Sequence, residues 1–246
     1  MNEHTLQTAS TAFGAVVVVT AVITELVMVG TAVGGTGELS QLTMDVHYLV
    51  MNAFLVAVSC LLLVSAYRFQ RLVVLLVGLG VSSWTLGHLY WTLYVYLAGS
   101  PITYPSVAEL GFQGFYVLLI PVTVYLHTLS GTRRPRRLFV FIPALGSLVL
   151  AVAFVNEAEL FRVGYSLLSL SLISVPLVLA MNLLLDRQYT LFAAGVAVFA
   201  GADIVYICLA VATPVLSVPF ADPLWYVSAA VLALSLIRYE REGLLA

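Results

Sequence analysis

The sequence predicts an all-α fold, a polytopic bundle of transmembrane helices that forms a single integral membrane domain over residues 1–246. Hydrophobic residues make up 62% of the chain and charged residues only 9%, and the mean hydropathy is +1.07. Soluble domains carry about 25% charged residues, so this chain has too few charges to cover a water-exposed surface. Long apolar runs are the third observation, because a helix needs about 20 apolar residues to cross the ~30 Å hydrocarbon core. We therefore expect a multi-pass protein of the cell membrane.

Eight apolar runs define the expected spans, and the breaks between them are rich in turn-forming and charged residues, as in GGTGELSQ and GTRRPRR. The first ten residues lack the positive segment of a secretory signal, so we expect the first span to be retained. The predicted spans are approximately 11–33, 44–66, 72–97, 107–129, 138–155, 162–185, 190–211 and 222–239.

The placement of arginine predicts the orientation. All ten basic residues are arginines. With eight spans, nine of the ten fall in segments on one side of the membrane, and only Arg162 falls on the other. Because Lys and Arg are enriched in cytoplasmic loops, both termini are predicted to be cytoplasmic. The RRPRR run at 133–137 is then a determinant of topology, with contact to anionic lipids as the alternative.

Ionisable residues inside the spans gather at one level. At 1.5 Å per residue, Glu25, His88 and Asp203 lie roughly 12–13 Å below the outer boundary. A charge near the bilayer centre costs about 2.5–3.5 kcal/mol, so we expect these groups to face the bundle interior and to satisfy one another. The inner half holds no other ionisable residue in the spans than His127. The predicted ligand-binding residues are Glu25, Asn52, Trp84, His88, Trp91, Glu109 and Asp203, and those of an outer rim are Asp45, His47, Gln113 and Asp222.

Structural roles are the alternative for these residues. A histidine in a membrane helix can simply bond a neighbouring helix, and buried acids can do the same. Trp84, His88 and Trp91 share one helical face by i, i+4, i+7 spacing, so both tryptophans could wall a pocket. An aromatic belt at the outer interface is the alternative for Trp91. A belt is the expected place of Tyr94, Tyr96, Tyr104, Trp225 and Tyr226.

Several chemistries are excluded or disfavoured. The chain has no lysine, so it cannot form a retinal Schiff base. His47 lies roughly 5 Å and His88 roughly 13 Å below the outer boundary, which disfavours bis-histidine haem, and no histidine pair shares a helical turn as zinc sites favour. We therefore predict no cofactor and no metal. Nucleophile and phosphate-binding motifs are missing, and a net charge of −2 offers no nucleic-acid role.

The loop YPSVAELGFQGFY, Tyr104 to Tyr116, carries a resemblance. A tryptophan-rich helix followed by an outer loop of the form P-[FY]-P-S-x-A-[DE] resembles a poorly characterised membrane region found in front of diguanylate cyclase, phosphodiesterase and histidine-kinase modules in bacteria and archaea. The similarity covers less than a fifth of the chain, from Trp84 to Tyr125. The matching positions are Trp84, Pro105, Ser106, Ala108, Glu109 and Tyr116.

This sequence departs from that pattern in two ways. Its first proline is displaced to Pro101, and Glu109 stands where aspartate is commoner. We expect no output domain, because little sequence follows Arg241, so the resemblance implies a membrane sensor region that signals through a separate partner. A structural role is the alternative for two of these residues, since Ser106 and Glu109 have the S-x-x-E spacing of a helix capping box.

The leading hypothesis is thus a stand-alone sensory or ligand-binding membrane module with an outward-facing polar pocket. A secondary transporter or proton pathway is the first alternative, because acids lie within the membrane. A structural membrane subunit is the second alternative, and an intramembrane enzyme is the weakest. Expected partners are membrane lipids and a separate signalling or membrane protein; the oligomeric state is not predicted.

Overall fold

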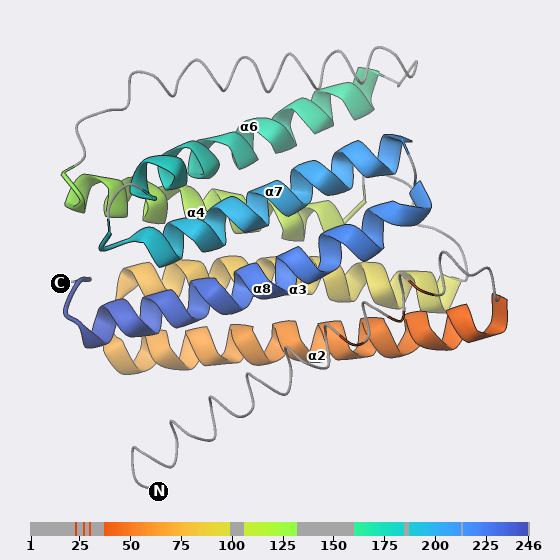
Figure 1. The fold of residues 1–246 in the computed structure, drawn as a ribbon, viewed down its shortest axis with the longest axis horizontal. Helices are drawn as coiled ribbons and strands as arrows, with labels where there is room; N and C mark the ends of the chain where they lie inside the picture. The colour runs from red at the N-terminus through yellow and green to blue at the C-terminus, as the bar shows by residue number, and fades with distance from the viewer. Residues whose placement is uncertain are drawn as a thin grey trace, which may run out of the picture.

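The computed structural model describes residues 37–98, 106–131, 160–184, 187–212 and 214–245, together with Ile23, Val27 and Gly30. Six helices make up this part of the chain (Figure 1). They match six of the predicted spans. The spans predicted at 11–33 and 138–155 lie outside the described residues, apart from three helical positions in the first. The helices are α2 (Gly37–Phe69), α3 (Leu72–Ala98), α4 (Ala108–Leu129), α6 (Leu160–Leu183), α7 (Thr190–Ala212) and α8 (Pro214–Arg241).

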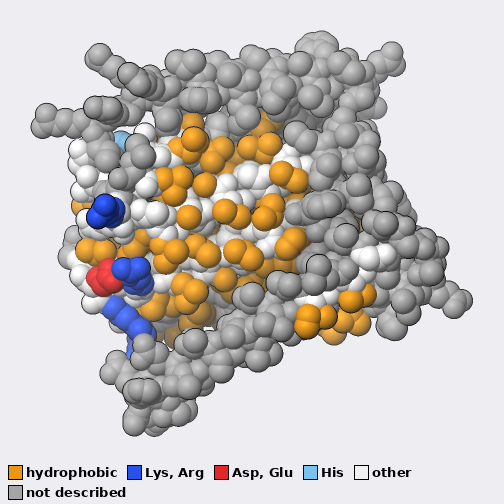
Figure 2. All heavy atoms as spheres, in the orientation of Figure 1, with side chains coloured by type: hydrophobic (Ala, Val, Ile, Leu, Met, Phe, Trp, Pro, Cys, Tyr) orange, Lys and Arg blue, Asp and Glu red, His pale blue; other side chains and the backbone are white. Residues whose placement is uncertain are grey.

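Four helical segments within the described residues are long and apolar enough to cross a membrane. Leu49 and Leu97 are 71% and 85% exposed, as side chains facing lipid would be. Figure 2 shows many hydrophobic side chains spread over the middle of one face. These features indicate a multi-pass membrane protein. The four segments are Asp45–Phe69, Leu72–Ala98, Ala108–Leu129 and Ala221–Arg241, and Ser169–Leu183 and Thr190–Tyr206 are shorter apolar stretches.

The six helices form a closed ring in which each helix packs against two others. Contacts run from α2 to α3, from α3 to α4, from α4 to α6, from α6 to α7 and from α7 to α8, and α8 returns to α2. Figure 1 shows the helices lying side by side along the long axis of the molecule. All six helices therefore face one common interior.

Glycine allows α3 and α4 to approach closely. A Cβ atom at Gly87 would lie 2.6 Å from the carbonyl oxygen of Ala108, and one at Gly111 would lie 2.6 Å from the Cα of Gly87. Ser83 uses this proximity, because its hydroxyl donates to the carbonyl of Gly111 at 3.0 Å. Small residues at such a crossing let two backbones touch, which favours helix association in a membrane.

Five described arginines gather at one end of the bundle, which we call the arginine end. Arg71 Nε lies 3.1 Å from Glu240 Oε2, which joins the start of α3 to the end of α8. The rings of Tyr189 and Tyr239 meet at 5.5 Å and bring the start of α7 to the same place. Figure 2 shows basic side chains, in blue, gathered at one side of the molecule. The arginine end comprises Arg68, Arg71, Arg187, Arg238 and Arg241.

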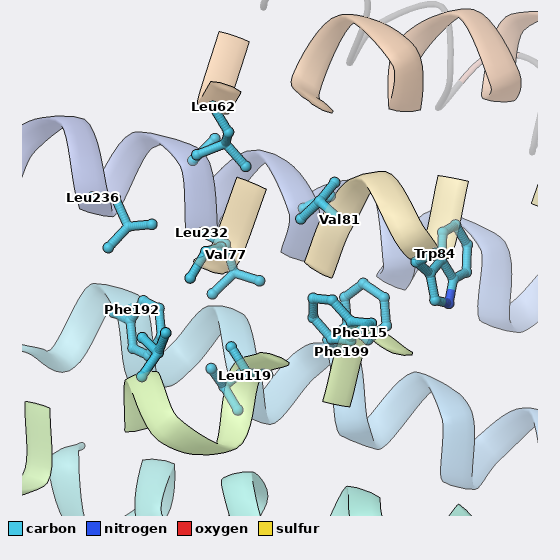
Figure 3. Close-up of a cluster of buried hydrophobic side chains, with 14 of the residues drawn as sticks. Leu62, Val77, Val81, Trp84, Phe115, Leu119, Phe192, Phe199, Leu232 and Leu236 are labelled. Carbon is cyan, nitrogen blue, oxygen red and sulfur yellow. The ribbon is translucent and has the colours of Figure 1, made fainter. Parts of the chain in front are cut away.

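A hydrophobic core fills the interior next to the arginine end (Figure 3). Phe192, Leu232 and Leu236 are fully buried there. Farther from the arginines, Phe115 and Phe199 stack with ring centroids 4.2 Å apart. We call this region the core layer; it includes Leu62, Val77, Leu119, Phe192, Leu232 and Leu236, and the Phe115–Phe199 stack bounds it.

Candidate functional site

A partly open cavity of about 150 Å³ lies between the core layer and the end of the bundle that is opposite the arginines. All six described helices contribute to its wall. A cavity of about this volume holds a molecule the size of benzene. Seven residues predicted for the site or its rim line it: Trp84, His88, Trp91, Glu109, Gln113, Asp203 and Asp222.

The other predicted residues lie around this cavity or away from it. Asn52 and His47 stand behind the wall, where they hydrogen-bond His88 and Asp222. Asp45 accepts a hydrogen bond from the Tyr96 hydroxyl. Glu25 lies outside the described residues.

The imidazole of His88 is held in one tautomer by Asn52. The carbonyl of Tyr48 can only accept, so the Asn52 amide nitrogen, 2.8 Å away, must donate to it. This directs the amide oxygen of Asn52 toward His88 Nδ1 at 3.1 Å. Nδ1 therefore carries a proton, and Nε2 is the nitrogen that makes none of the described hydrogen bonds. His88 thus binds the neighbouring helix, as the structural alternative predicted, and also lines the cavity.

Aromatic donors hold the carboxylate of Asp203. The indole Nε1 of Trp225 donates to Oδ1 at 2.7 Å, and the hydroxyl of Tyr116 donates to Oδ2. An indole N–H can only donate, so it requires an acceptor oxygen on Asp203. We expected His88 and the buried acids to satisfy one another, but the structure pairs Asp203 with two rings and His88 with Asn52. Residues at the same depth in the membrane therefore do not necessarily bond one another.

Trp84 connects the two groups. Its ring stacks on His88, with centroids 5.4 Å apart and an interplanar angle of 24°. On another side it meets Trp225 at 5.3 Å. His88 and Asp203 are therefore joined through indole rings.

A buried histidine–carboxylate pair does form, but between two residues predicted for the outer rim. His47 Nε2 lies 2.7 Å from Asp222 Oδ2, and both side chains are almost fully buried. The pair joins α2 to α8, where the ring of helices closes. Asp222 is part of the cavity wall, so His47 fixes a lining residue from behind.

Near the N-terminal end of α4, a side chain of this helix bonds a side chain of α6. The amide nitrogen of Gln113 donates to the hydroxyl of Ser169 at 2.9 Å, which ties α4 to α6. Ser106 accepts from the backbone N–H of Ala108 at 3.2 Å, as an N-cap does. This is a bond to the first turn of α4, whereas the predicted capping box pairs Ser106 with Glu109; Glu109 lines the cavity one turn further along.

The aromatic belt prediction is wrong for two residues. Trp225 is 7% exposed and Tyr226 4%, because both point into the bundle. Tyr94 and Tyr96, at 38% and 49%, are exposed as belt residues would be. Tyr104 lies outside the described residues. Trp91 lines the cavity, so all three tryptophans of the chain are cavity residues.

Sequence reasoning missed much of the apolar wall, although helical spacing carried a signal. Residues three positions after a predicted acid share its face. Phe112 follows Glu109, Tyr206 follows Asp203 and Trp225 follows Asp222 at this spacing. Tyr48 and Ile173 had no such signal. The missed lining residues are Tyr48, Phe112, Tyr116, Ser169, Ile173, Tyr206 and Trp225.

The fold and the cavity define a class: a multi-pass helical membrane protein with a partly open cavity that aromatic and acidic residues line. Among the described residues, no group of three or more His, Cys, Asp or Glu side chains is placed to hold a metal ion. Comparisons with protein-family models, curated proteins and solved structures find no match to this chain.

Proposed function

We propose that this protein is a sensory or ligand-binding membrane module whose cavity takes a small molecule from the outer side of the membrane. The observation that carries this proposal is the cavity of about 150 Å³ with aromatic walls and polar groups from separate helices. Ligand sites are concave and mostly apolar, and a few placed polar groups give them specificity. The proposed ligand-binding residues are Trp84, His88, Trp91, Glu109 and Asp203. Asn52 supports His88 from behind the wall.

The proposed topology has eight spans and cytoplasmic termini. The gathering of five arginines at one end supports it, because positive residues are retained in the cytoplasm. The cavity lies toward the opposite end, which the same rule makes the outer side. Glu25 belongs to the first of the eight spans and remains a candidate by its depth alone.

Signalling would follow from the shape of the cavity. A ligand there touches all six described helices, so binding biases the packing of the whole ring. The α2–α3 turn and the end of α8, joined by Arg71 and Glu240, would carry this change to the cytoplasmic side. A separate partner or anionic lipid would read it there.

The core layer argues against the transporter alternative. Phe115 and Phe199 stack below the cavity, and Leu119 and Phe192 are buried beyond them. A substrate or proton would have to cross this apolar region to reach the arginine end. Flux into proteoliposomes that Asp203→Asn abolishes would instead establish transport.

The proposal is tested with three probes that share one hydrocarbon body: 3,3-dimethylbutylamine, 3,3-dimethylbutan-1-ol and 3,3-dimethylbutanoate. Because every tryptophan lines the cavity, the intrinsic fluorescence of protein in lipid nanodiscs reports on its occupancy. We expect at least one probe to change the emission saturably. Ile173→Phe should abolish that change, because it places a ring in the cavity.

Val117→Phe is the matched control, since Val117 is 53% exposed on the outside of α4 and should leave binding unchanged. Hydrogen exchange at the α2–α3 turn then separates sensing from mere binding: a bound probe should alter it. If no probe binds, or if Ile173→Phe binds as well as the original protein, the cavity is not a ligand site.

A further inference from the structure

We infer that the cavity selects small organic cations, namely protonated amines that carry an apolar body. This inference rests on the proposed function, because it names the class of ligand for the same site. Three features of the cavity wall support it: its charge, its hydrogen-bonding groups and its aromatic faces.

The charge of the wall is one-sided. Glu109, Asp203 and Asp222 line the cavity. No arginine is among the described lining residues, and the chain has no lysine. Carboxyl groups around one small space disfavour an anion, and each one that is ionised attracts a cation, more strongly where water is excluded. An anionic ligand is therefore the least suited to this site.

Two hydrogen-bonding groups of the wall, on His88 and Gln113, are left with an acceptor atom. His88 donates its Nδ1 proton to Asn52, so Nε2 of the neutral ring can only accept a hydrogen bond. Gln113 uses its amide nitrogen to bond Ser169, which leaves its oxygen as an acceptor. A ligand that satisfies such a wall must bring donors. An ammonium group supplies three donors and no acceptor.

The carboxylates are held in place for this task. Trp225 donates to Oδ1 of Asp203 and Tyr116 donates to Oδ2, so both oxygens of this carboxyl group have fixed positions. His47 fixes Asp222 through Oδ2. A pre-positioned carboxylate loses little conformational freedom when a cation binds.

Aromatic faces complete the site. Seven aromatic residues line the cavity, and three of them are tryptophans. The face of an indole attracts a cation more strongly than other side-chain rings do. Trp84 and Trp225, 5.3 Å apart, stand on the side of the cavity where Asp203 lies. An ammonium bound to Asp203 would therefore contact aromatic rings as well as oxygen atoms.

The same three probes test this inference, because they share a neopentyl body and their head groups differ in charge and in hydrogen-bond donors. By tryptophan fluorescence in nanodiscs, we expect the amine to bind about tenfold more tightly than the alcohol, and the carboxylate not to bind. Glu109→Gln and Asp203→Asn should each reduce the preference for the amine over the alcohol. Asp45→Asn is the matched control, since Asp45 is an acid near the same end that does not line the cavity.

Circular dichroism and elution volume establish which variants fold. Glu109 is partly exposed, so Glu109→Gln keeps the test available if Asp203→Asn fails to fold. Saturable binding in which the alcohol or the carboxylate equals the amine would overturn the inference while leaving the proposed function intact. A preference for the amine that survives both substitutions would also overturn it. If none of the three probes binds, the proposed function itself fails.

Discussion

The same six helices build two different interiors. Next to the arginine end, the core layer is closely packed and apolar, as the stacking of Phe115 on Phe199 shows. Toward the opposite end, the interior holds a cavity lined by three acids, one of which forms a buried pair with a histidine. Helix α3 displays the change within one element. Val77 belongs to the hydrophobic core, whereas His88 and Trp91, further along the helix, line the cavity.

The difference indicates that one half of the bundle provides stability and the other half provides the binding site. Close packing without voids stabilises a bundle, whereas a cavity and buried polar groups cost stability. A protein that keeps polar groups and empty space in one half relies on the other half to hold its helices together. Substitutions in the core layer should therefore change stability more than binding, and substitutions around the cavity should do the reverse.

The largest effect is expected from Phe192→Ala in the core layer. Phe192 is fully buried against the hydrophobic cluster, and removing a buried ring costs about 3 kcal/mol or more. Unfolding by detergent titration measures this loss. The dissociation constant of the best probe should stay within about twofold, since Phe192 is not a lining residue.

Leu191→Ala is the control for this variant, because Leu191 is the adjacent residue and is 37% exposed. It should change the free energy of unfolding by less than about 0.5 kcal/mol. Equal losses in the two variants would show that the core layer does not have the stabilising role assigned to it.

His47→Ala should have the next largest effect, because it leaves a buried carboxylate of Asp222 without its histidine. Truncating one partner of a buried pair costs about 3–5 kcal/mol in soluble proteins, and interhelical bonds in membranes average about 0.6 kcal/mol, so we expect about 2 kcal/mol. Asp45→Ala removes the bond to the exposed Tyr96 and should cost less than about 1 kcal/mol. The comparison fails if both variants lose the same stability.

Gly87→Ala should have the smallest of the three effects, about 1–2 kcal/mol. The new methyl group would meet the Ala108 carbonyl oxygen at 2.6 Å, which forces α3 and α4 apart along one wall of the cavity. Gly201→Ala is the matched control, because nothing lies within 4 Å of its added Cβ. Alanine is the better helix former, so this control should be neutral or more stable by up to about 1 kcal/mol. Equal behaviour of the two variants would contradict the close crossing of α3 and α4.

The sequence was sufficient for the helices that lie within the described residues. Apolar runs predicted spans at 72–97 and 107–129, and the helices are Leu72–Ala98 and Ala108–Leu129. The predicted starts at 44 and 222 differ from the observed starts of α2 at Gly37 and α8 at Pro214. For α2 the reason is physical: hydropathy marks where a helix is apolar, and α2 begins in the polar sequence GELSQLT. The added residues of α8, PVLSVPFA, are apolar, and their two prolines had indicated a loop. The segments of the two helices that are apolar enough to cross a membrane, Asp45–Phe69 and Ala221–Arg241, match the predictions closely.

The sequence predicted the depth of the site residues in the membrane, but not how each helix is rotated about its own axis. Rise per residue placed His88 and Asp203 at one level, and both line the same cavity. Their hydrogen-bond partners depend on how each helix is turned about its axis, which a single sequence does not encode in a readable way. Asp203 bonds Tyr116, 87 residues away, and no local spacing links them. Trp225 was predicted to lie in the aromatic belt for the same reason, because the rotation of its helix could not be derived from the sequence.

The central claim is that aromatic and acidic side chains converge inside the bundle. Brominated lipids test it most directly, because they quench the fluorescence of tryptophans that face acyl chains. The protein with Trp84→Phe and Trp91→Phe retains Trp225 alone, and a second protein carries these two changes together with Trp225→Phe and Tyr94→Trp. Because Trp225 is 7% exposed and Tyr94 38%, the first should be quenched only weakly and the second strongly. Strong quenching of Trp225 by brominated lipid would place it against the membrane and contradict the cavity on which the proposed function depends.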